Sequence, residues 1–363
     1  MSIPSKILKI HDFLIANPLE QFTIIDVRSP AEFDEDHVPG AVNQPVLNNE
    51  ERAFIGTMHK QVSSFKAREA GARIISKNIS SILENISPLS ENKKPFIIYC
   101  WRGGMRSKSL FTVMDMIGYK TYILEGGYKS YRRTVHQTLD SECTVVAQDK
   151  SMNIFSQIQE FLSIHGYTGS GKTELLQLLC SDYPVIDLEK AAVHRGSLLG
   201  SFKNTPQPSQ KRFETNLFFQ IFHQRNAGRM LVEGESRKIG NLSIPSVVWK
   251  KMKEGKKIWV ELPLSFRIRN SIDVYQKDSL HILNKLFLLE EALGSKKTEW
   301  IREKLKNEQY EDAAEMLLSE YYDPLYTKHS PEYHPERYSK VIHAENLNDL
   351  YEKVRHYLKK ISF

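Results

Sequence analysis

The chain has 363 residues, and its 40% hydrophobic and 26% charged content is typical of a soluble globular protein with room for two domains. Three widely spaced cysteines argue against a disulfide framework or a thiolate zinc site, and no apolar run approaches the ~20 residues of a membrane span. The 50 Lys and Arg against 44 Asp and Glu give a net charge of +6, which is compatible with RNA or another polyanion. The N-terminal sequence has no apolar signal-peptide core, so we expect a cytoplasmic protein with no membrane partner, and we expect it to be a monomer.

The first 140 residues alternate short β-rich runs with helical patterns. Strands are predicted at residues 22–27, 96–99 and 121–124. Ser29 can cap a short helix that begins at Pro30, and helical spacing continues after each of the later strands. This alternation predicts a mostly parallel sheet that is covered on both faces.

A cysteine follows the second of these strands, in the stretch Tyr99-Cys100-Trp101-Arg102-Gly103-Gly104-Met105-Arg106-Ser107. The loop joins a buried strand to a helix N-terminus, where unpaired N–H groups and the helix dipole favour negative charge. Two glycines allow the N–H groups to point inward, and two arginines add positive charge. We therefore predict that Cys100 is a largely ionised, reactive thiol inside an oxyanion-binding loop. The loop residues are Arg102, Gly103, Gly104 and Arg106.

A plainer interpretation is that Cys100 is a buried residue at a strand end, because free cysteine is often buried. An apolar pocket would not need two arginines and two glycines nearby, so we favour the reactive cysteine. The spacing from Cys100 to Arg106 fits either a cysteine phosphatase or a sulfur-transferring rhodanese, since both bring a tetrahedral oxyanion to a thiolate.

The N-terminal half resembles the rhodanese family. The pieces that carry the resemblance are Asp26-Val27-Arg28, Glu32-Phe33, His37-Val38-Pro39-Gly40-Ala41 and the Cys100 loop, in that order. The resemblance implies that Asp26 and Arg28 are structural and tie loops together under the active site. A polar helical stretch at residues 50–85 is longer than a minimal rhodanese needs, which suggests an insertion that shapes the pocket or a partner surface.

A phosphate-binding loop of the form G-x-x-x-x-G-K-[ST] begins at Gly166. A candidate strand at residues 161–164 precedes it and a leucine-rich helix follows it, which is the order that the motif requires. The glycines let backbone N–H groups wrap a diphosphate, the lysine neutralises it, and the threonine hydroxyl can hold Mg²⁺. The predicted diphosphate-binding residues are Gly166, Gly169, Ser170, Gly171, Lys172 and Thr173.

Two later apolar runs, at residues 184–187 and 229–235, end in acids that could deliver a carboxylate to Mg²⁺. Asp187, Glu233 and Glu235 are the candidates, and strand-end capping or ion pairing is an equally open interpretation of each. We predict Thr173 and Glu235 as metal ligands. The aromatic helix at residues 208–225 is expected to pack in the core, with the lining of an apolar substrate tail as the lesser alternative.

The last third of the chain has a strand at residues 256–261 and then mostly helical patterns, at residues 280–293, 300–318 and 347–361. Three lysine pairs gather positive charge here. A solvated face is the usual meaning of such pairs, and a tRNA contact is the alternative. The pairs are Lys250-Lys251, Lys256-Lys257 and Lys296-Lys297.

The sequence therefore predicts an α/β protein with two domains. A rhodanese-like parallel-sheet domain with Cys100 occupies residues 1–140, a linker follows at 141–156, and a P-loop NTPase-like α/β domain with a helical C-terminal region occupies 157–363. This uncommon combination resembles the tRNA 2-selenouridine synthase family. Besides the two loops, the motifs that match are Leu124-Glu125-Gly126-Gly127-Tyr128 and Val232-Glu233-Gly234-Glu235-Ser236-Arg237.

The family resemblance implies two steps on the wobble 2-thiouridine of certain tRNAs. Geranyl diphosphate first geranylates the sulfur at the P-loop, and selenium from selenophosphate then replaces the S-geranyl group through a selanyl-cysteine at Cys100. It also implies a selenophosphate supplier as a partner, and both loops acting on one nucleoside. Two alternatives remain open at this point: an ATP-dependent tRNA sulfur transferase or kinase, and a phosphate-sensing module without catalysis.

Overall fold

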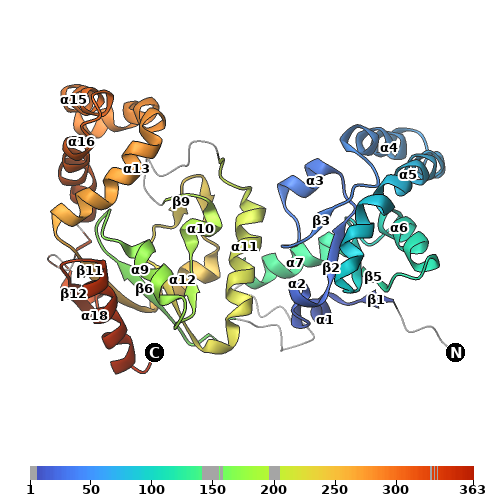
Figure 1. Ribbon diagram of the computed structural model, residues 1–363, viewed down its shortest axis with the longest axis horizontal. Helices are drawn as coiled ribbons and strands as arrows, with labels where there is room; N and C mark the ends of the chain where they lie inside the picture. The colour runs from blue at the N-terminus through green and yellow to red at the C-terminus, as the bar shows by residue number, and fades with distance from the viewer. Residues whose placement is uncertain are drawn as a thin grey trace. The chain divides into compact units, whose positions relative to one another are not determined.

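The computed structural model describes residues 6–140, 155, 158–195, 205–327, 329–330, 332 and 334–363. The chain forms two compact units, Met1–Thr138 and Leu139–Phe363 (Figure 1). The predicted linker at residues 141–156 lies outside the described residues except for Phe155, so it stays a prediction.

The first unit is built on a parallel sheet of short strands. Among its described residues, the strand order is β1-β5-β4-β2-β3, and every neighbouring pair is parallel. The three central strands carry the apolar runs predicted from the sequence, and β4 is buried along its whole length. The strands are β1 (Ile7–Leu8), β2 (Thr23–Asp26), β3 (Val42–Asn43), β4 (Phe96–Tyr99) and β5 (Thr121–Leu124).

Helices connect these strands. Ser29 caps α3, and its backbone N–H is bonded to the carboxylate of Glu32, as expected for a capping box. Leu110 and Met114 of α6 are buried on the sheet, so its apolar face covers the core. The short and connecting helices are α1 (Ile10–Ile15), α2 (Pro18–Gln21), α3 (Pro30–Glu35), α6 (Met105–Met116) and α7 (Gly127–Asp140).

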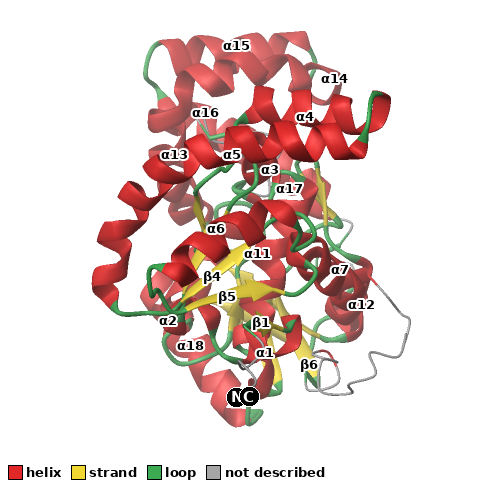
Figure 2. Cartoon of the chain, turned by 90° about the vertical axis from the view of Figure 1, so that its right-hand side faces the viewer, coloured by secondary structure: helices red, strands yellow, loops and turns green. Residues whose placement is uncertain are grey.

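The polar stretch at residues 50–85 is a hairpin of two helices, α4 (Asn49–Gln61) and α5 (Ser64–Ile86), which lie side by side (Figures 1 and 2). The break comes at Ser63, whose hydroxyl accepts a bond from the N–H of Phe65 and so starts the second helix. A 3₁₀ turn at Ser87–Asn92 then leads back to β4. The hairpin buries Ala67 and Ile75 against the sheet domain, and its outer face mixes polar residues with the exposed side chains of Phe54 and Phe65.

The second unit has its own parallel sheet, with the order β12-β11-β6-β8-β7 among the described residues. The strand order places β6, which precedes the P-loop, between β8 and β11. A small antiparallel hairpin, β9 (Lys238–Ile239) with β10 (Leu242–Ser243), follows β8. The sheet strands are β6 (Glu160–His165), β7 (Val185–Ile186), β8 (Arg229–Glu233), β11 (Lys256–Glu261) and β12 (Lys340–His343).

Helices cover this sheet and share its apolar core. Leu175 and Leu179 of α9 pack in one apolar cluster with Val354 of α18. The helices are α9 (Lys172–Leu179), α10 (Leu188–Ala192), α11 (Gln210–His223), α12 (Ser246–Glu254) and α18 (Leu347–Lys360).

A helical region with its own apolar cluster follows β11 (Figure 1). The run predicted at residues 280–293 is not one helix, because α13 ends at Lys285 and a 3₁₀ turn at Leu286–Leu289 separates it from α14. Leu286 and Leu289 are both buried, and their spacing of three suits the three residues per turn of a 3₁₀ helix. The elements are α13 (Leu264–Lys285), α14 (Glu290–Leu293), α15 (Ser295–Lys306), α16 (Tyr310–Leu317), a π-helical turn at Leu318–Tyr322, α17 (Asp323–Thr327) and a 3₁₀ turn at Pro335–Arg337.

The predicted fold class is confirmed: each unit is α/β with a parallel sheet, and the C-terminal region is largely helical. The edge strands β1 and β12 were not predicted, because each offers only two consecutive apolar residues and no alternating pattern. Within the described part of the chain, no helix is long and apolar enough to cross a membrane.

Candidate active site

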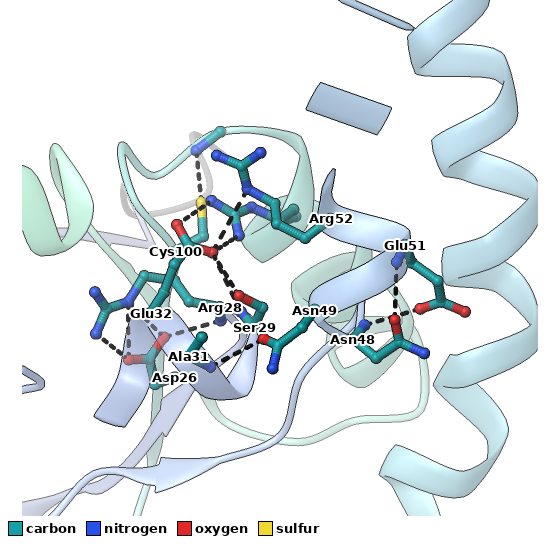
Figure 3. Close-up of polar contacts among 12 residues, drawn as sticks. Asp26, Arg28, Ser29, Ala31, Glu32, Asn48, Asn49, Glu51, Arg52 and Cys100 are labelled. Carbon is teal, nitrogen blue, oxygen red and sulfur yellow. Dashed lines mark hydrogen bonds and ion pairs between the residues drawn. The ribbon is translucent and has the colours of Figure 1, made fainter. Parts of the chain in front are cut away.

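Cys100 lies at the carboxyl end of β4 and is only 3% exposed. The backbone N–H of Gly104 donates a hydrogen bond to its sulfur at 3.2 Å (Figure 3). The Ser107 hydroxyl lies 3.3 Å from the same atom. The loop therefore curls around the sulfur before α6 begins at Met105. The cysteine is buried, as the plainer interpretation expected, and its sulfur also meets an inward-pointing N–H group, whereas its reactivity stays a prediction.

Two glycines allow this curl. Gly103 has a φ of +67°, a backbone conformation that favours glycine. Gly127, in the Gly126-Gly127 pair after β5, has a φ of +57°, and a Cβ atom there would lie 2.2 Å from the Cys100 carbonyl oxygen and 2.6 Å from the Gly103 nitrogen. A side chain at position 127 would therefore displace the Cys100 loop. Gly104 has free space around its Cα and needs no glycine on steric grounds.

The two predicted loop arginines differ in their partners. Arg106 forms an ion pair with Glu32 of α3, with 2.6 Å between Nη1 and Oε2, and Arg52 of α4 lies 3.6 Å from the same oxygen (Figure 3). Although burial opposes ionisation of Glu32, the hydrogen bond and the charge of Arg106 lower its pKa. Arg102 is exposed, and no described residue pairs with its guanidinium. Arg102 is thus the loop cation that is more available to an incoming anion.

A buried ion pair supports the loop from β2. Asp26 and Arg28 are 0% and 1% exposed, and three hydrogen bonds of 3.1, 3.0 and 2.6 Å join their side chains (Figure 3). Arg28 also donates to the Asp36 carbonyl and stacks on Tyr128, whose hydroxyl donates to the Asp36 carboxylate. Burial disfavours the charged guanidinium, but Asp26 outweighs it and raises the pKa of Arg28. The pair is structural, as the rhodanese resemblance implied.

The predicted P-loop follows β6 and opens α9 at Lys172. Gly169 and Gly171 have φ values of +78° and +69°, and a Cβ atom on Gly166 would lie 2.5 Å from the Val260 carbonyl oxygen. The Lys172 ammonium donates to the carbonyl oxygens of Gly166 and Tyr167, at 3.0 and 3.1 Å. The lysine therefore folds over its own loop, at the place where a diphosphate would accept its hydrogen bonds.

Carboxylates gather at the end of the P-loop around Thr173. The Thr173 hydroxyl lies 2.7 Å from Glu233 Oε1 and 3.0 Å from Glu189 Oε2. Burial and mutual repulsion raise the pKa of Glu189 to about 8 and raise that of Glu233 as well, and burial raises that of Glu235. Such a donor set of a hydroxyl and carboxylate oxygens fits Mg²⁺, whose charge would relieve the repulsion.

The structure distinguishes the three acids that were predicted as candidate metal ligands. Glu233 contacts Thr173 directly, so Thr173 and Glu233 are the residues best placed to hold Mg²⁺. Asp187 accepts the N–H of Lys190 and caps α10, which is the plainer alternative raised for it. Glu235 contributes charge near Glu189, and its role as a metal ligand stays a prediction.

A buried arginine braces the P-loop from α13. Arg267 donates to the carbonyl oxygen of Thr168 at 2.9 Å and forms a double ion pair with Asp323. Its guanidinium also lies 4.9 Å from the centre of the Tyr167 ring. This contact ties the helical C-terminal region to the phosphate-binding loop.

Several residues of the site were not predicted. Ser107, although it lies within the Cys100 motif, was not given a role, and Glu189 and Arg267 come from helices that the sequence did not place near the P-loop. The aromatic residues of α11 are buried in the core, as expected. Lysines from each of the three pairs bond to the protein itself, which favours a structural use of those lysines. The buried aromatics are Phe213, Phe218, Phe219 and Phe222, and the bonded lysines are Lys251, Lys256 and Lys297.

Comparison with known proteins gives two family matches. Residues 14–134 match the model of a rhodanese-like domain, and residues 159–307 match the model described as the tRNA 2-selenouridine synthase AAA domain. Each match contains one of the two loops, Cys100 in the first and the P-loop in the second.

Similar curated proteins carry the name tRNA 2-selenouridine synthase. One from Nitrosomonas europaea is 35% identical over 268 residues, which are 73% of this chain and 66% of that protein. One from Hydrogenovibrio crunogenus is 30% identical over 335 residues, which are 85% of this chain and 89% of that protein. The match to a relative from Nitrosomonas eutropha spans 62% of that protein, so the chain covers about two thirds of the Nitrosomonas relatives.

Proposed function

Because this chain belongs to the tRNA 2-selenouridine synthase family, we propose that it is an enzyme that converts the wobble 2-thiouridine of tRNA into 2-selenouridine. The observation that carries this proposal is the presence in one chain of two different loops, a cysteine loop and a diphosphate-type loop, each at a strand end of a parallel sheet. We propose that each loop carries out one step of the exchange.

The first proposed step is geranylation of the thiouridine sulfur at the P-loop. The C2 sulfur forms a bond to the allylic carbon of geranyl diphosphate, the carbon–oxygen bond to diphosphate breaks, and the nucleoside loses its N3 proton. The backbone N–H groups of the loop and Lys172 would bind the diphosphate as its negative charge grows. Thr173 and Glu233 would hold Mg²⁺, which supplies further charge neutralisation when bound.

The second proposed step is replacement of the S-geranyl group by selenium at Cys100. S-alkylation turns the sulfur into a leaving group, so that a C2–Se bond forms as the C2–S bond breaks and geranylthiol departs. The exchange is redox-neutral overall, because water takes the phosphoryl group of selenophosphate and phosphate is released. Selenophosphate is an oxyanion, so Arg102 and the Gly104 N–H would hold it beside Cys100. The Cys100 thiolate would take its phosphoryl group as the phosphorus–selenium bond breaks, which frees selenide to attack C2, and water would then release phosphate from the sulfur.

The proposal is tested by incubating the purified protein with tRNA that contains wobble 2-thiouridine, Mg²⁺ and geranyl diphosphate, and then measuring nucleoside masses. We expect S-geranyl-2-thiouridine after the first incubation and 2-selenouridine after selenophosphate is added. Absence of the geranylated nucleoside, together with tRNA-stimulated hydrolysis of ATP, would instead favour the alternative of an ATP-dependent tRNA sulfur transferase or kinase.

Partner and compartment follow from the same chemistry. A protein that makes selenophosphate would supply the second substrate, and we propose the cytoplasm as the place where tRNA, selenophosphate and a reduced Cys100 occur together. The expected monomeric state stays a prediction.

A further inference from the structure

A cavity of about 520 Å³ opens directly over Cys100. The Cys100 loop forms one side, and the α4–α5 hairpin forms the other. The sequence had left open whether this hairpin shapes a pocket or a partner surface. Its residues line the cavity, so it shapes a pocket.

The inner wall of the cavity is hydrocarbon. Leu47, Ala67 and Ile75 are buried and belong to the apolar core of the first unit, and Ile55 of α4 packs against the same cluster. Trp101 and Met105 of the Cys100 loop add apolar surface next to the sulfur, and both line the cavity. Selenophosphate alone would have no use for such a wall, because a small, highly charged oxyanion gains nothing from apolar surface.

The rim of the cavity is positively charged. Lys60, Arg68 and Arg102 are exposed, and all three line the cavity. No carboxylate is among the described residues that line it. A ligand that suits both the apolar wall and the positive rim must combine an apolar chain with negative charge. A nucleoside within RNA does so when it carries a hydrocarbon substituent, because the phosphate backbone is anionic.

We infer that this cavity holds the geranyl chain of the S-geranylated wobble nucleoside while selenium replaces the sulfur at Cys100. The inference rests on the proposed function, because that reaction brings a ten-carbon chain to the cysteine. If each carbon group takes about the volume of a water molecule, roughly 30 Å³, such a chain needs about 300 Å³, which leaves room for the selenium donor. The aromatic residues of α11, the lesser alternative for an apolar tail, are packed in the core instead.

The cavity makes selenation depend on earlier geranylation. A nucleoside whose thiocarbonyl has not been alkylated has no chain to bury in the apolar wall, so it binds weakly at Cys100. An S-methyl nucleoside carries a chemically similar leaving group but also lacks the chain. Comparing S-geranyl with S-methyl substrates therefore isolates the contribution of the cavity from that of the leaving group.

The test uses two anticodon stem-loop RNAs, one with S-geranyl-2-thiouridine and one with S-methyl-2-thiouridine, in the presence of selenophosphate. For the wild-type protein we expect kcat/KM to be at least about 100-fold higher for the S-geranyl RNA, in line with the discrimination that apolar pockets reach. Ala67→Phe, which fills the cavity, and Ile55→Asn, which makes its wall polar, should each reduce this ratio by about tenfold or more.

The control is Phe54→Ala, which shortens an apolar residue of the same helix α4 that is 55% exposed and does not line the cavity. We expect it to keep the wild-type ratio. In Ile55→Asn the rate with the S-geranyl RNA should fall about tenfold more than the rate with the S-methyl RNA, whereas general damage to the fold would lower both rates together.

Two failures are distinguishable. If the wild-type protein selenates neither RNA, the proposed function itself is wrong. If it selenates both RNAs at similar rates, or if Ile55→Asn retains the full preference for the S-geranyl RNA, the cavity does not hold the chain and the proposed function stands without it.

Discussion

The two loops of this chain have the same place in their sheets but different surroundings. Each follows a buried parallel strand and opens a helix, β4 into α6 and β6 into α9. Around Cys100 there are arginines and a partly apolar cavity, whereas around Lys172 there are its own loop carbonyls and buried carboxylates. In both units a strand–loop–helix connection provides the anion site, and the neighbouring elements decide which chemistry occurs there.

Two buried arginines, Arg28 in the first unit and Arg267 in the second, pack under the two loops, and removing them should give the largest expected difference in stability. Arg28→Ala leaves Asp26 buried and unpaired, so we expect a loss of about 3–5 kcal/mol in the free energy of unfolding, measured by urea denaturation. Arg267→Ala breaks a pair whose carboxylate, Asp323, is 27% exposed, so its cost should be clearly smaller. Equal losses in the two variants would contradict this account of the supports.

The rate of geranylation at the P-loop should depend on the Thr173 hydroxyl, which contacts the carboxylates of Glu233 and Glu189. Thr173→Val keeps the side-chain volume and removes the proposed Mg²⁺ ligand, so the rate of geranylation should fall by about 100-fold. Selenation of RNA that is already geranylated should not change, because Cys100 is in the other unit. A parallel loss of both steps would mean that the two loops do not divide the reaction.

Of the glycines around Cys100, Gly127 should tolerate a side chain less well than Gly104. Gly127→Ala places a Cβ atom 2.2 Å from the Cys100 carbonyl oxygen, so we expect a stability loss of about 1–3 kcal/mol and a changed rate of Cys100 alkylation by iodoacetamide. Gly104→Ala meets no atom within 4 Å and should unfold at the wild-type temperature. If Gly127→Ala alkylates and unfolds as wild type does, the close packing of the two loop segments is wrong.

The smallest expected effect concerns the Arg106–Glu32 pair and depends on pH. The pKa of Glu32 is lowered in the folded protein, so its ion pair stabilises the fold above the ordinary glutamate pKa, and this contribution is lost as the pH falls through the lowered value. Glu32→Gln should therefore cost about 1 kcal/mol near neutral pH and almost nothing at pH values below the lowered pKa. Urea denaturation of the wild type and Glu32→Gln at both pH values checks this prediction. The same difference in the free energy of unfolding at the two pH values would contradict it.

Much of the fold and both loops could be predicted from the sequence, because the signals are local. The apolar run of β4 and the glycines of the P-loop each determine their own backbone within a few residues. Glu189 and the wall of the cavity could not be predicted, since they depend on how a separate helix packs over the loop. The acid at Thr173 is a similar case: Glu233 ends β8 and Glu235 comes two residues later, and only the packed strand end shows that Glu233 makes the contact.

The central claim is that the two loops carry out separate steps, and one measurement tests it most directly: nucleoside masses from tRNA treated with Cys100→Ala or Lys172→Ala protein. Cys100→Ala should accumulate S-geranyl-2-thiouridine and form no 2-selenouridine. Lys172→Ala should form no geranylated nucleoside, yet it should convert supplied S-geranyl RNA into 2-selenouridine. Loss of both steps in either folded variant would contradict the account.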